Sequence, residues 1–278
     1  MILNKRMSIL VSGCSYTENA KWVDELFTNV INYGKSGAGN TYISNSIIYN
    51  IDLLNPPSYV FILFSGVNRI DLSVPKTLDT QKLAIELKYY GIVNDILYLF
   101  TGSDKINIQI CRNYRNIKSL AWPEIYCIDD FLKLPKKIKD ECIEKQIFYF
   151  GLENSDLMSM INTSMMLNYL NDTNYLQTLT YQNILNCQTF LERHLIPYNF
   201  SFISNVFDTN NKTQFGVLNK SHPLYKRINW SNYINDTPYE FAVKYNCLAD
   251  DQFHLSHHGQ RLWAQKIRNK IPKKILTR

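Results

Sequence analysis

The stretch Tyr59-Val-Phe-Ile-Leu-Phe64 is an uninterrupted run of apolar residues, most of them β-branched or aromatic. A strand with one face in solvent alternates apolar and polar residues, whereas a continuous apolar run is typical of a strand covered on both faces. The segment Asn55-Pro56-Pro57 separates this run from any preceding helix, because proline removes a backbone donor. We therefore predict a central strand over 59–64, buried in the middle of a parallel sheet.

Strands and helices are expected to alternate on the N-terminal side of this run. The apolar run Ser8–Val11 stops at Ser12-Gly13, which is typical of a buried strand that ends in a turn. The expected order is a strand at 8–11, a helix at 18–27, a strand at 29–32 closed by a glycine-rich turn at 34–39, a helix at 41–54 and the strand at 59–64. Such a series predicts a parallel sheet with right-handed crossovers.

The C-terminal region continues this pattern. The expected elements are a helix at 175–194, a strand at 198–203, an irregular polar segment at 208–246 and a closing helix at 259–271. Residues 71–173 carry helical patches at 78–99 and a possible strand at 106–110, but no motif. We therefore predict an α/β fold, a three-layer α/β/α sandwich with a parallel central sheet. It forms a single domain over 1–278, with a large, mostly helical insertion at 71–173 as a candidate lid.

Composition places the chain among soluble globular proteins. Its 278 residues are 45% hydrophobic and 19% charged, and the net charge of +6 is spread along the chain, which does not favour a nucleic-acid partner. Its six cysteines include no closely spaced pair, which argues against a disulfide framework and against a zinc site. Because we find no signal peptide and no apolar run of about 18 residues, we expect a cytoplasmic protein without a membrane partner.

Small polar residues follow three of the predicted strands. They are Ser12-Gly-Cys-Ser-Tyr-Thr17, Asn32-Tyr-Gly-Lys-Ser-Gly37 and Ser65-Gly-Val-Asn68, and a fourth polar segment, Asp250-Asp-Gln-Phe-His-Leu-Ser256, precedes the last helix. Because ligands of open parallel sheets bind beyond the carboxyl ends of the strands, we expect these segments to meet. They offer a hydroxyl nucleophile, backbone N–H donors, a side-chain amide and an Asp/His pair, which is what acyl transfer requires.

In this order the segments resemble the four blocks of the SGNH hydrolases, a branch of the GDSL esterase/lipase superfamily. Gly13-Cys14-Ser15 is similar to the first block, although Cys14 stands where the family usually has Asp. Gly37 matches the glycine of the second block best. The resemblance therefore implies that Ser15 is the nucleophile and that the N–H groups of Ser15 and Gly37 belong to an oxyanion hole.

The third and fourth blocks complete the resemblance. Gly66-Val67-Asn68 is similar to the third block, although Arg69 follows where Asp is usual. Asp251-Gln-Phe-His254 fits the fourth block. The resemblance implies that the amide of Asn68 joins the oxyanion hole, and that Asp251 and His254 complete a catalytic triad with Ser15.

Elementary chemistry agrees with these roles. A serine hydroxyl is a poor nucleophile until a base takes its proton, and the imidazole of His254 is suited to that task near neutral pH. Asp251 can hold the imidazole in the correct tautomer. We therefore predict hydrolysis of small acyl esters, by resemblance O-acetyl esters on carbohydrate first, through an acyl-Ser15 intermediate and without a metal or organic cofactor.

Several alternatives stay open. The same chemistry could transfer the acyl group to a sugar, and the departures at Cys14 and Arg69 leave room for an inactive binding protein with this fold. Cys14 could itself be the nucleophile, although the middle side chain of a Gly-x-Ser turn is expected to point into the fold. His254 and His258 would share a helical face and could hold a metal, although a surface position is the simpler interpretation. The oligomeric state is open.

Three other site classes are excluded. An α/β-hydrolase elbow needs Gly two residues after the serine, where this chain has Thr17. The Gly34-Lys35-Ser36 triplet lacks the earlier glycine of a phosphate-binding loop, because position 29 is Asn. A dinucleotide fingerprint starting at Gly37 would need Gly at position 42, which is Tyr.

Overall fold

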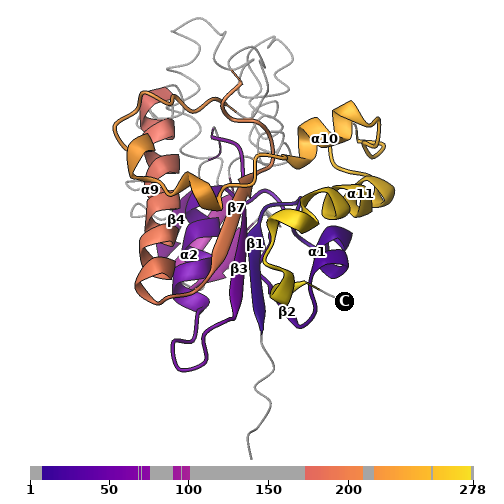
Figure 1. Ribbon diagram of the computed structural model, residues 1–278. Helices are drawn as coiled ribbons and strands as arrows, with labels where there is room; N and C mark the ends of the chain where they lie inside the picture. Colours follow the sequence, from indigo (N-terminus) through magenta and orange to yellow (C-terminus); the bar gives the residue numbers. More distant parts are fainter. Residues whose placement is uncertain are drawn as a thin grey trace, which may run out of the picture.

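A parallel four-stranded sheet forms the centre of the protein (Figure 1). The computed structural model describes residues 8–67, 69, 71–75, 90–94, 96–100, 173–208, 216–251 and 253–276. The strands lie in the order β2-β1-β3-β7, and each neighbouring pair is parallel. Their bounds are Ile9–Gly13 for β1, Val30–Asn32 for β2, Tyr59–Phe64 for β3 and Tyr198–Phe202 for β7. The predicted α/β fold with a parallel central sheet is confirmed.

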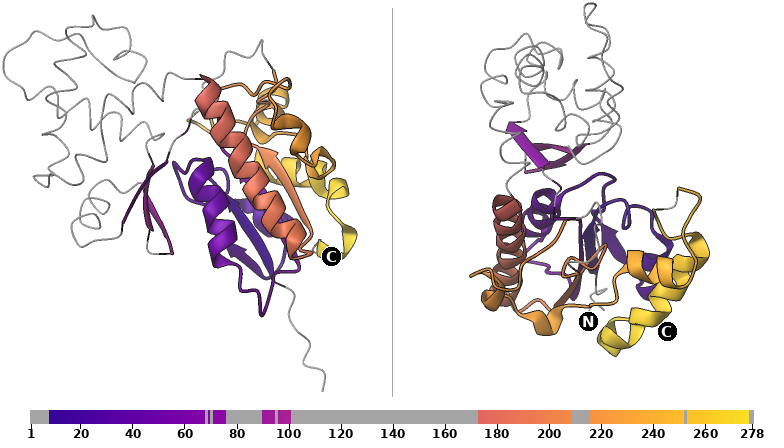
Figure 2. Two further views of the ribbon diagram at one scale, coloured as in Figure 1. Left: turned by 90° about the vertical axis from the view of Figure 1, so that its left-hand side faces the viewer. Right: turned by 90° about the horizontal axis from the view of Figure 1, so that it is seen from above.

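Helices cover both faces of this sheet, which is therefore the middle layer of three (Figure 2). On one face α2, Asn40–Asn50, packs against α9, Thr173–Arg193. On the other face α1, Lys21–Leu26, packs against α11, His257–Ile267. A shorter helix, α10, Pro238–Lys244, contacts α11. None of the helices within the described ranges is long and apolar enough to span a bilayer.

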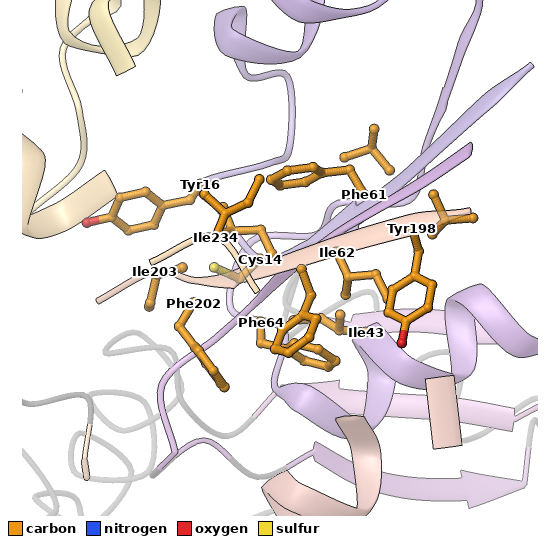
Figure 3. Packing of buried hydrophobic residues seen from close by; sticks show 14 of the residues in the cluster. Cys14, Tyr16, Ile43, Phe61, Ile62, Phe64, Tyr198, Phe202, Ile203 and Ile234 are labelled. Carbon is orange, nitrogen blue, oxygen red and sulfur yellow. The ribbon is translucent and has the colours of Figure 1, made fainter. Parts of the chain in front are cut away.

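The central strand β3 is buried along its whole length, as its sequence predicts. Its side chains alternate between the faces, with Phe61 on one side of the sheet and Phe64 on the other (Figure 3). The ring of Phe61 lies 5.3 Å from that of Trp22 in α1, and Phe64 lies 5.8 Å from Phe202. Trp22 in turn meets Trp263 of α11 edge to face at 5.1 Å. Aromatic contacts thus hold the α1 and α11 layer to the central strand.

The helices α11 and α1 begin at other residues than predicted, because local hydrogen bonds determine where each one starts. Helix α11 begins at His257, before the expected Gly259, because the Ser256 hydroxyl accepts a hydrogen bond from the N–H of Gly259 at 3.1 Å and caps the helix. Helix α1 begins at Lys21 and not at Glu18, because a tight turn precedes it. Short 3₁₀ helices lie at Tyr225–Arg227, Trp230–Asn232, Arg268–Lys270 and Lys273–Ile275. The first two and α10 fall in the segment that we expected to be irregular.

The described part of the predicted insertion is strand and not helix. Strands β4, Asp71–Pro75, β5, Tyr90–Val93, and β6, Ile96–Phe100, form an antiparallel sheet in the order β4-β6-β5. The helix expected at 78–99 is therefore wrong from Tyr90 onward. Asn94, with a φ of 47°, lies in the two-residue connection between β5 and β6, as tight hairpins require. The strand expected at 106–110 lies outside the described residues, and a single domain over the whole chain stays a prediction.

Trp263→Ala tests the contact between the helical layer and the sheet. The substitution removes a fully buried ring and the hydrogen bond from its Nε1 to the carbonyl of Asp236. We expect the free energy of unfolding, measured by urea denaturation, to fall by about 3–5 kcal/mol. Leu54→Ala is the control, because Leu54 is 87% exposed, and it should change this free energy by less than about 0.5 kcal/mol. A similarly small loss for Trp263→Ala would contradict the proposed packing.

Candidate active site

The residues that follow β1 form a tight turn, which we name the Ser15 turn (14–19). The N–H of Thr17 donates to the carbonyl of Cys14 at 2.8 Å. A glycine is required before this turn, because a Cβ on Gly13 would lie 2.1 Å from Oγ1 of Thr17. The side chain of Cys14 is fully buried, as predicted, whereas Ser15 is half-buried. The turn therefore places Ser15 at the carboxyl end of the central sheet, where the sequence predicts the site.

Ser15 meets a histidine from the other end of the chain. Oγ of Ser15 lies 2.7 Å from Nε2 of His254, although 239 residues separate the two. Nδ1 of His254 lies 2.6 Å from Oδ2 of Asp251. Because a carboxylate only accepts hydrogen bonds, the ring proton belongs on Nδ1, which leaves Nε2 to accept from the Ser15 hydroxyl. The structure thus brings Ser15, His254 and Asp251 into one hydrogen-bonded chain, a geometry in which an imidazole can take a serine proton.

Asp251 is held by the loop that carries it, which we name the His254 loop (248–255). A bridge between Leu248 and Leu255 closes the loop. Oδ1 of Asp251 accepts from the N–H groups of Phe253 and His254, each at 2.9 Å. Partial burial raises the pKa of Asp251, but these hydrogen bonds and the one from the His254 ring outweigh it, so the net pKa lies below its usual value. Asp251 is therefore ionised near neutral pH and can stabilise a protonated imidazole.

Tyr16 ties the Ser15 turn to the His254 loop, a role that the sequence pattern does not predict. Its hydroxyl donates to the carbonyl of Phe253, and its ring centre lies 4.8 Å from that of His254. Tyr16 is buried, and this burial raises the pKa of its hydroxyl, which therefore stays a donor. The only signal in the sequence is its place directly after Ser15. Tyr16 is thus a positioning residue that connects the Ser15 turn to the loop that carries the imidazole.

The glycine-rich turn (34–39) packs directly on the Ser15 turn. A Cβ on Gly34 would lie 2.7 Å from the backbone nitrogen of Glu18, so only glycine allows this approach. Gly37 has a φ of 84°, which glycine adopts without strain. Within the described residues, neither the N–H of Ser15 nor that of Gly37 donates a hydrogen bond. Both groups lie on adjoining turns at the carboxyl end of the sheet.

Asn40, the first residue of α2, holds the loop after β3. Its Oδ1 accepts from the N–H of Ser65 at 2.8 Å, and its Nδ2 donates to the carbonyl of Gly66 at 3.4 Å. Its side chain is buried, and the sequence carries no signal for these contacts beyond its position after the glycine-rich turn. Asn68, which we expect in the oxyanion hole, lies outside the described residues, so its role stays a prediction.

A buried carboxylate, Asp71, caps the N-terminus of α2, and the sequence pattern does not predict this role either. Its Oδ1 accepts from the N–H of Gly39 and its Oδ2 from the N–H of Tyr42, each at 2.7 Å. Burial raises the pKa of Asp71 to about 6, although these hydrogen bonds and the charge of Arg69 act in the opposite direction. Through Gly39, this carboxylate fixes the end of the glycine-rich turn.

This geometry supports neither Cys14 as the nucleophile nor a metal held by His254 and His258. The thiol of Cys14 is buried in the core, whereas a nucleophile has to reach its substrate. Both ring nitrogens of His254 already have protein partners, and His258 is exposed on α11. In the part of the chain that the structure describes, no three His, Cys, Asp or Glu side chains gather as a metal site would require.

Comparisons with known proteins do not identify a function for this chain. No protein-family model matches the chain, and no curated protein matches its sequence. Among solved structures, one from Bacteroides fragilis, described provisionally as an acylhydrolase, is similar at a TM-score of 0.27 and 12% identity. The match covers 96% of this chain and 89% of that chain. A similarity at this level assigns neither a family nor an activity.

Asp71 makes the stability of the protein depend on pH. Its carboxyl has a pKa of about 6 in the folded protein against an ordinary value of 3.8, so the folded state binds the proton more tightly. Its contribution to the free energy of unfolding is therefore fully present below pH 3.8 and is lost as the pH rises through 6, a change of roughly 3 kcal/mol. We expect the difference in this free energy between wild type and Asp71→Asn to fall by that amount between about pH 4 and about pH 7.

Urea denaturation across this pH range measures the difference. Asp24→Asn, at an exposed carboxylate of α1, is the matched control and should leave the pH dependence of the wild type in place. A difference between wild type and Asp71→Asn that stays constant, or that grows with pH, would contradict the assignment.

Proposed function

We propose that this protein is a serine esterase of the SGNH type that hydrolyses small acyl esters, O-acetyl esters on carbohydrate first. The observation that carries the proposal is the hydrogen-bonded chain from Oγ of Ser15 through the His254 ring to Asp251. A hydroxyl, an imidazole and a carboxylate in this arrangement serve acyl transfer on several unrelated folds. The order of the four sequence blocks supports the narrower assignment to the SGNH type.

The first half of the reaction forms an acyl-enzyme. Nε2 of His254 takes the proton of the Ser15 hydroxyl while Oγ attacks the carbonyl carbon of the ester, and the carbonyl oxygen becomes an oxyanion. Asp251 stabilises the imidazolium that results. When the oxyanion collapses, the bond to the alcohol breaks and His254 returns the proton to the leaving oxygen. The acyl group then remains on Ser15.

The second half releases the acid. His254 takes a proton from a water molecule, whose oxygen attacks the acyl carbon, and the bond to Oγ of Ser15 breaks as the proton returns to Oγ. Access of water and substrate is supported by the exposure of the two partners, since the side chain of His254 is 32% exposed and that of Asp251 is 51% exposed. Transfer of the acyl group to a sugar would follow the same steps with a sugar hydroxyl in place of water.

The oxyanion is expected to receive three donors. These are the N–H groups of Ser15 and Gly37 and the side-chain amide of Asn68. In support, the glycine-rich turn packs on the Ser15 turn, and Asn40 binds the backbone of Ser65 and Gly66 directly after β3. Removal of one such donor typically costs about 10²–10³ in kcat.

Hydrolysis of p-nitrophenyl acetate tests the proposal. We expect Ser15→Ala and His254→Ala each to lower kcat/KM by at least about 10³-fold, because each removes one member of a unit that acts together. His258→Ala is the matched control, since it removes an exposed histidine from the start of α11, and it should retain the activity of the wild type. Equal rates for wild type, Ser15→Ala and His254→Ala would refute the proposal, whether all three are active or all inert.

A fluorophosphonate probe gives a second readout. Such probes form a covalent bond with an activated serine, so mass spectrometry of the labelled protein should place the adduct on Ser15. His254→Ala should abolish the labelling, because the base that activates the hydroxyl is missing. An adduct on another serine would exclude Ser15 as the nucleophile.

Tyr16→Phe tests the proposed positioning role. The substitution keeps the ring against His254 and removes only the hydrogen bond to the carbonyl of Phe253. We expect kcat to fall about tenfold, which corresponds to one hydrogen bond, while KM changes less than about twofold. Tyr49→Phe is the control at an exposed tyrosine of α2. Equal kcat values for Tyr16→Phe and wild type would show that the hydroxyl does not position the imidazole.

A further inference from the structure

A positive charge stands in the loop that follows β3, where the SGNH pattern usually has Asp. The N–H of Arg69 donates to the carbonyl of Gly66 at 3.3 Å, so the residue lies in a turn directly after the strand. Strand β3 is the parallel neighbour of β1, and Leu63 is paired with Gly13. The turn that carries Arg69 and the Ser15 turn therefore leave neighbouring strands at the same end of the sheet.

The charge of Arg69 acts on Tyr16, the residue next to the proposed catalytic serine. Burial raises the pKa of the Tyr16 hydroxyl, and the positive charge of Arg69 acts against this rise as the smallest of its causes. Tyr16 follows Ser15 and contacts the ring of His254. The positive charge of Arg69 thus acts to lower the pKa of the hydroxyl that connects the Ser15 turn to the His254 loop.

One part of this guanidinium has no partner. Nη1 of Arg69 is buried and makes no hydrogen bond among the described residues. An unsatisfied buried donor destabilises the folded protein, so proteins retain one where a ligand or another function explains it. Arginine is always charged and offers five donors in a planar fork, which suits a carboxylate.

Asp71 does not satisfy this donor. The two oxygens of Asp71 accept from the N–H groups of Gly39 and Tyr42, and no ion pair within 4.0 Å joins Asp71 to Arg69 in the described part of the chain. The charge of Arg69 lowers the pKa of Asp71 only as one of several smaller effects that oppose burial. Asp71 therefore leaves Nη1 of Arg69 without an acceptor among the described residues.

We propose that Arg69 binds a carboxylate of the substrate next to the ester that Ser15 attacks. This inference rests on the proposed function and narrows it, because it makes the preferred substrates anionic esters. The carboxylate can belong to the alcohol, as in an O-acetylated acidic sugar, or to the acyl group, as in the half-ester of a dicarboxylic acid. In either case the fork of Arg69 receives the two carboxylate oxygens.

Two matched pairs of esters separate these sources. The alcohol pair is 4-acetoxybenzoate and its methyl ester, and the acyl pair is p-nitrophenyl monoglutarate and p-nitrophenyl valerate. The measured quantity is the ratio of kcat/KM for the charged ester to that for the neutral one. In the wild type we expect this ratio to exceed about 10 in at least one pair, as a charge-assisted hydrogen bond would produce. A ratio of one or less in both pairs overturns the proposal.

Two substitutions at Arg69 test the residue itself. Arg69→Gln should lower the ratio of the preferred pair about tenfold or more, and Arg69→Lys, which keeps the positive charge, should lower it less. Arg227→Gln removes an exposed arginine of a 3₁₀ helix and should leave the ratio unchanged. A general effect on folding would lower kcat/KM equally for both esters of a pair. An unchanged ratio in Arg69→Gln, or an equal drop in Arg227→Gln, therefore overturns the proposal.

A binding measurement distinguishes this failure from failure of the proposed function. Calorimetric titration of Ser15→Ala with 4-acetoxybenzoate and with glutarate needs no turnover. The carboxylate site is supported if Ser15→Ala binds one of these anions and Ser15→Ala/Arg69→Gln binds the same anion with an affinity at least about tenfold lower. This holds even if the wild type hydrolyses none of the esters. In that case only the proposed function fails. Equal binding by the two variants, or binding by neither, overturns the carboxylate site.

Discussion

The hydrogen bond between Ser15 and His254 requires the first strand and the last helix of the protein to be held at a fixed separation. Such a bond weakens within a few tenths of an ångström and with small changes of angle, so neither turn can drift. The edge-to-face contact of Trp22 and Trp263 fixes the helices α1 and α11 that accompany the two turns. Tyr16 adds a direct hydrogen bond from the Ser15 turn to the His254 loop. These contacts on one face of the sheet therefore help to fix the distance between Oγ of Ser15 and Nε2 of His254.

On the opposite face, the N-terminus of α2 organises the donors that would meet an oxyanion. The first N–H groups of a helix lack intrahelical partners, and a carboxylate placed there satisfies them and interacts favourably with the helix dipole. Asp71 does this for Gly39 and Tyr42, and Asn40 reaches from the same helix end to Ser65 and Gly66. The glycine-rich turn and the loop after β3 are thus anchored at one point. Because Asp71 is also the first residue of β4, the region that we predicted as an insertion begins at this anchor.

The two departures from the SGNH pattern have different physical consequences. Cys14 takes the place of a polar residue at a position where the side chain is fully buried, and there it fills space in the core. Arg69 reverses the sign of the charge expected in the loop after β3 and leaves a buried donor unsatisfied. The first departure changes packing without touching the reacting groups, whereas the second supplies the unpaired donor on which the proposed carboxylate site rests.

The sequence by itself determined the central strand and its layers, since a strand covered on both faces must be apolar throughout, and β3 has the predicted bounds 59–64. The resemblance of four ordered blocks to the SGNH hydrolases led to Ser15, Asp251 and His254, and the structure brings these three side chains together. The prediction from sequence failed at 90–100, where the apolar spacing fits a hairpin as well as the helix that we expected. Only the tertiary structure decided the roles of Tyr16, Asn40 and Asp71. Each acts through a backbone group distant in the chain, and such a partner leaves no local pattern in sequence.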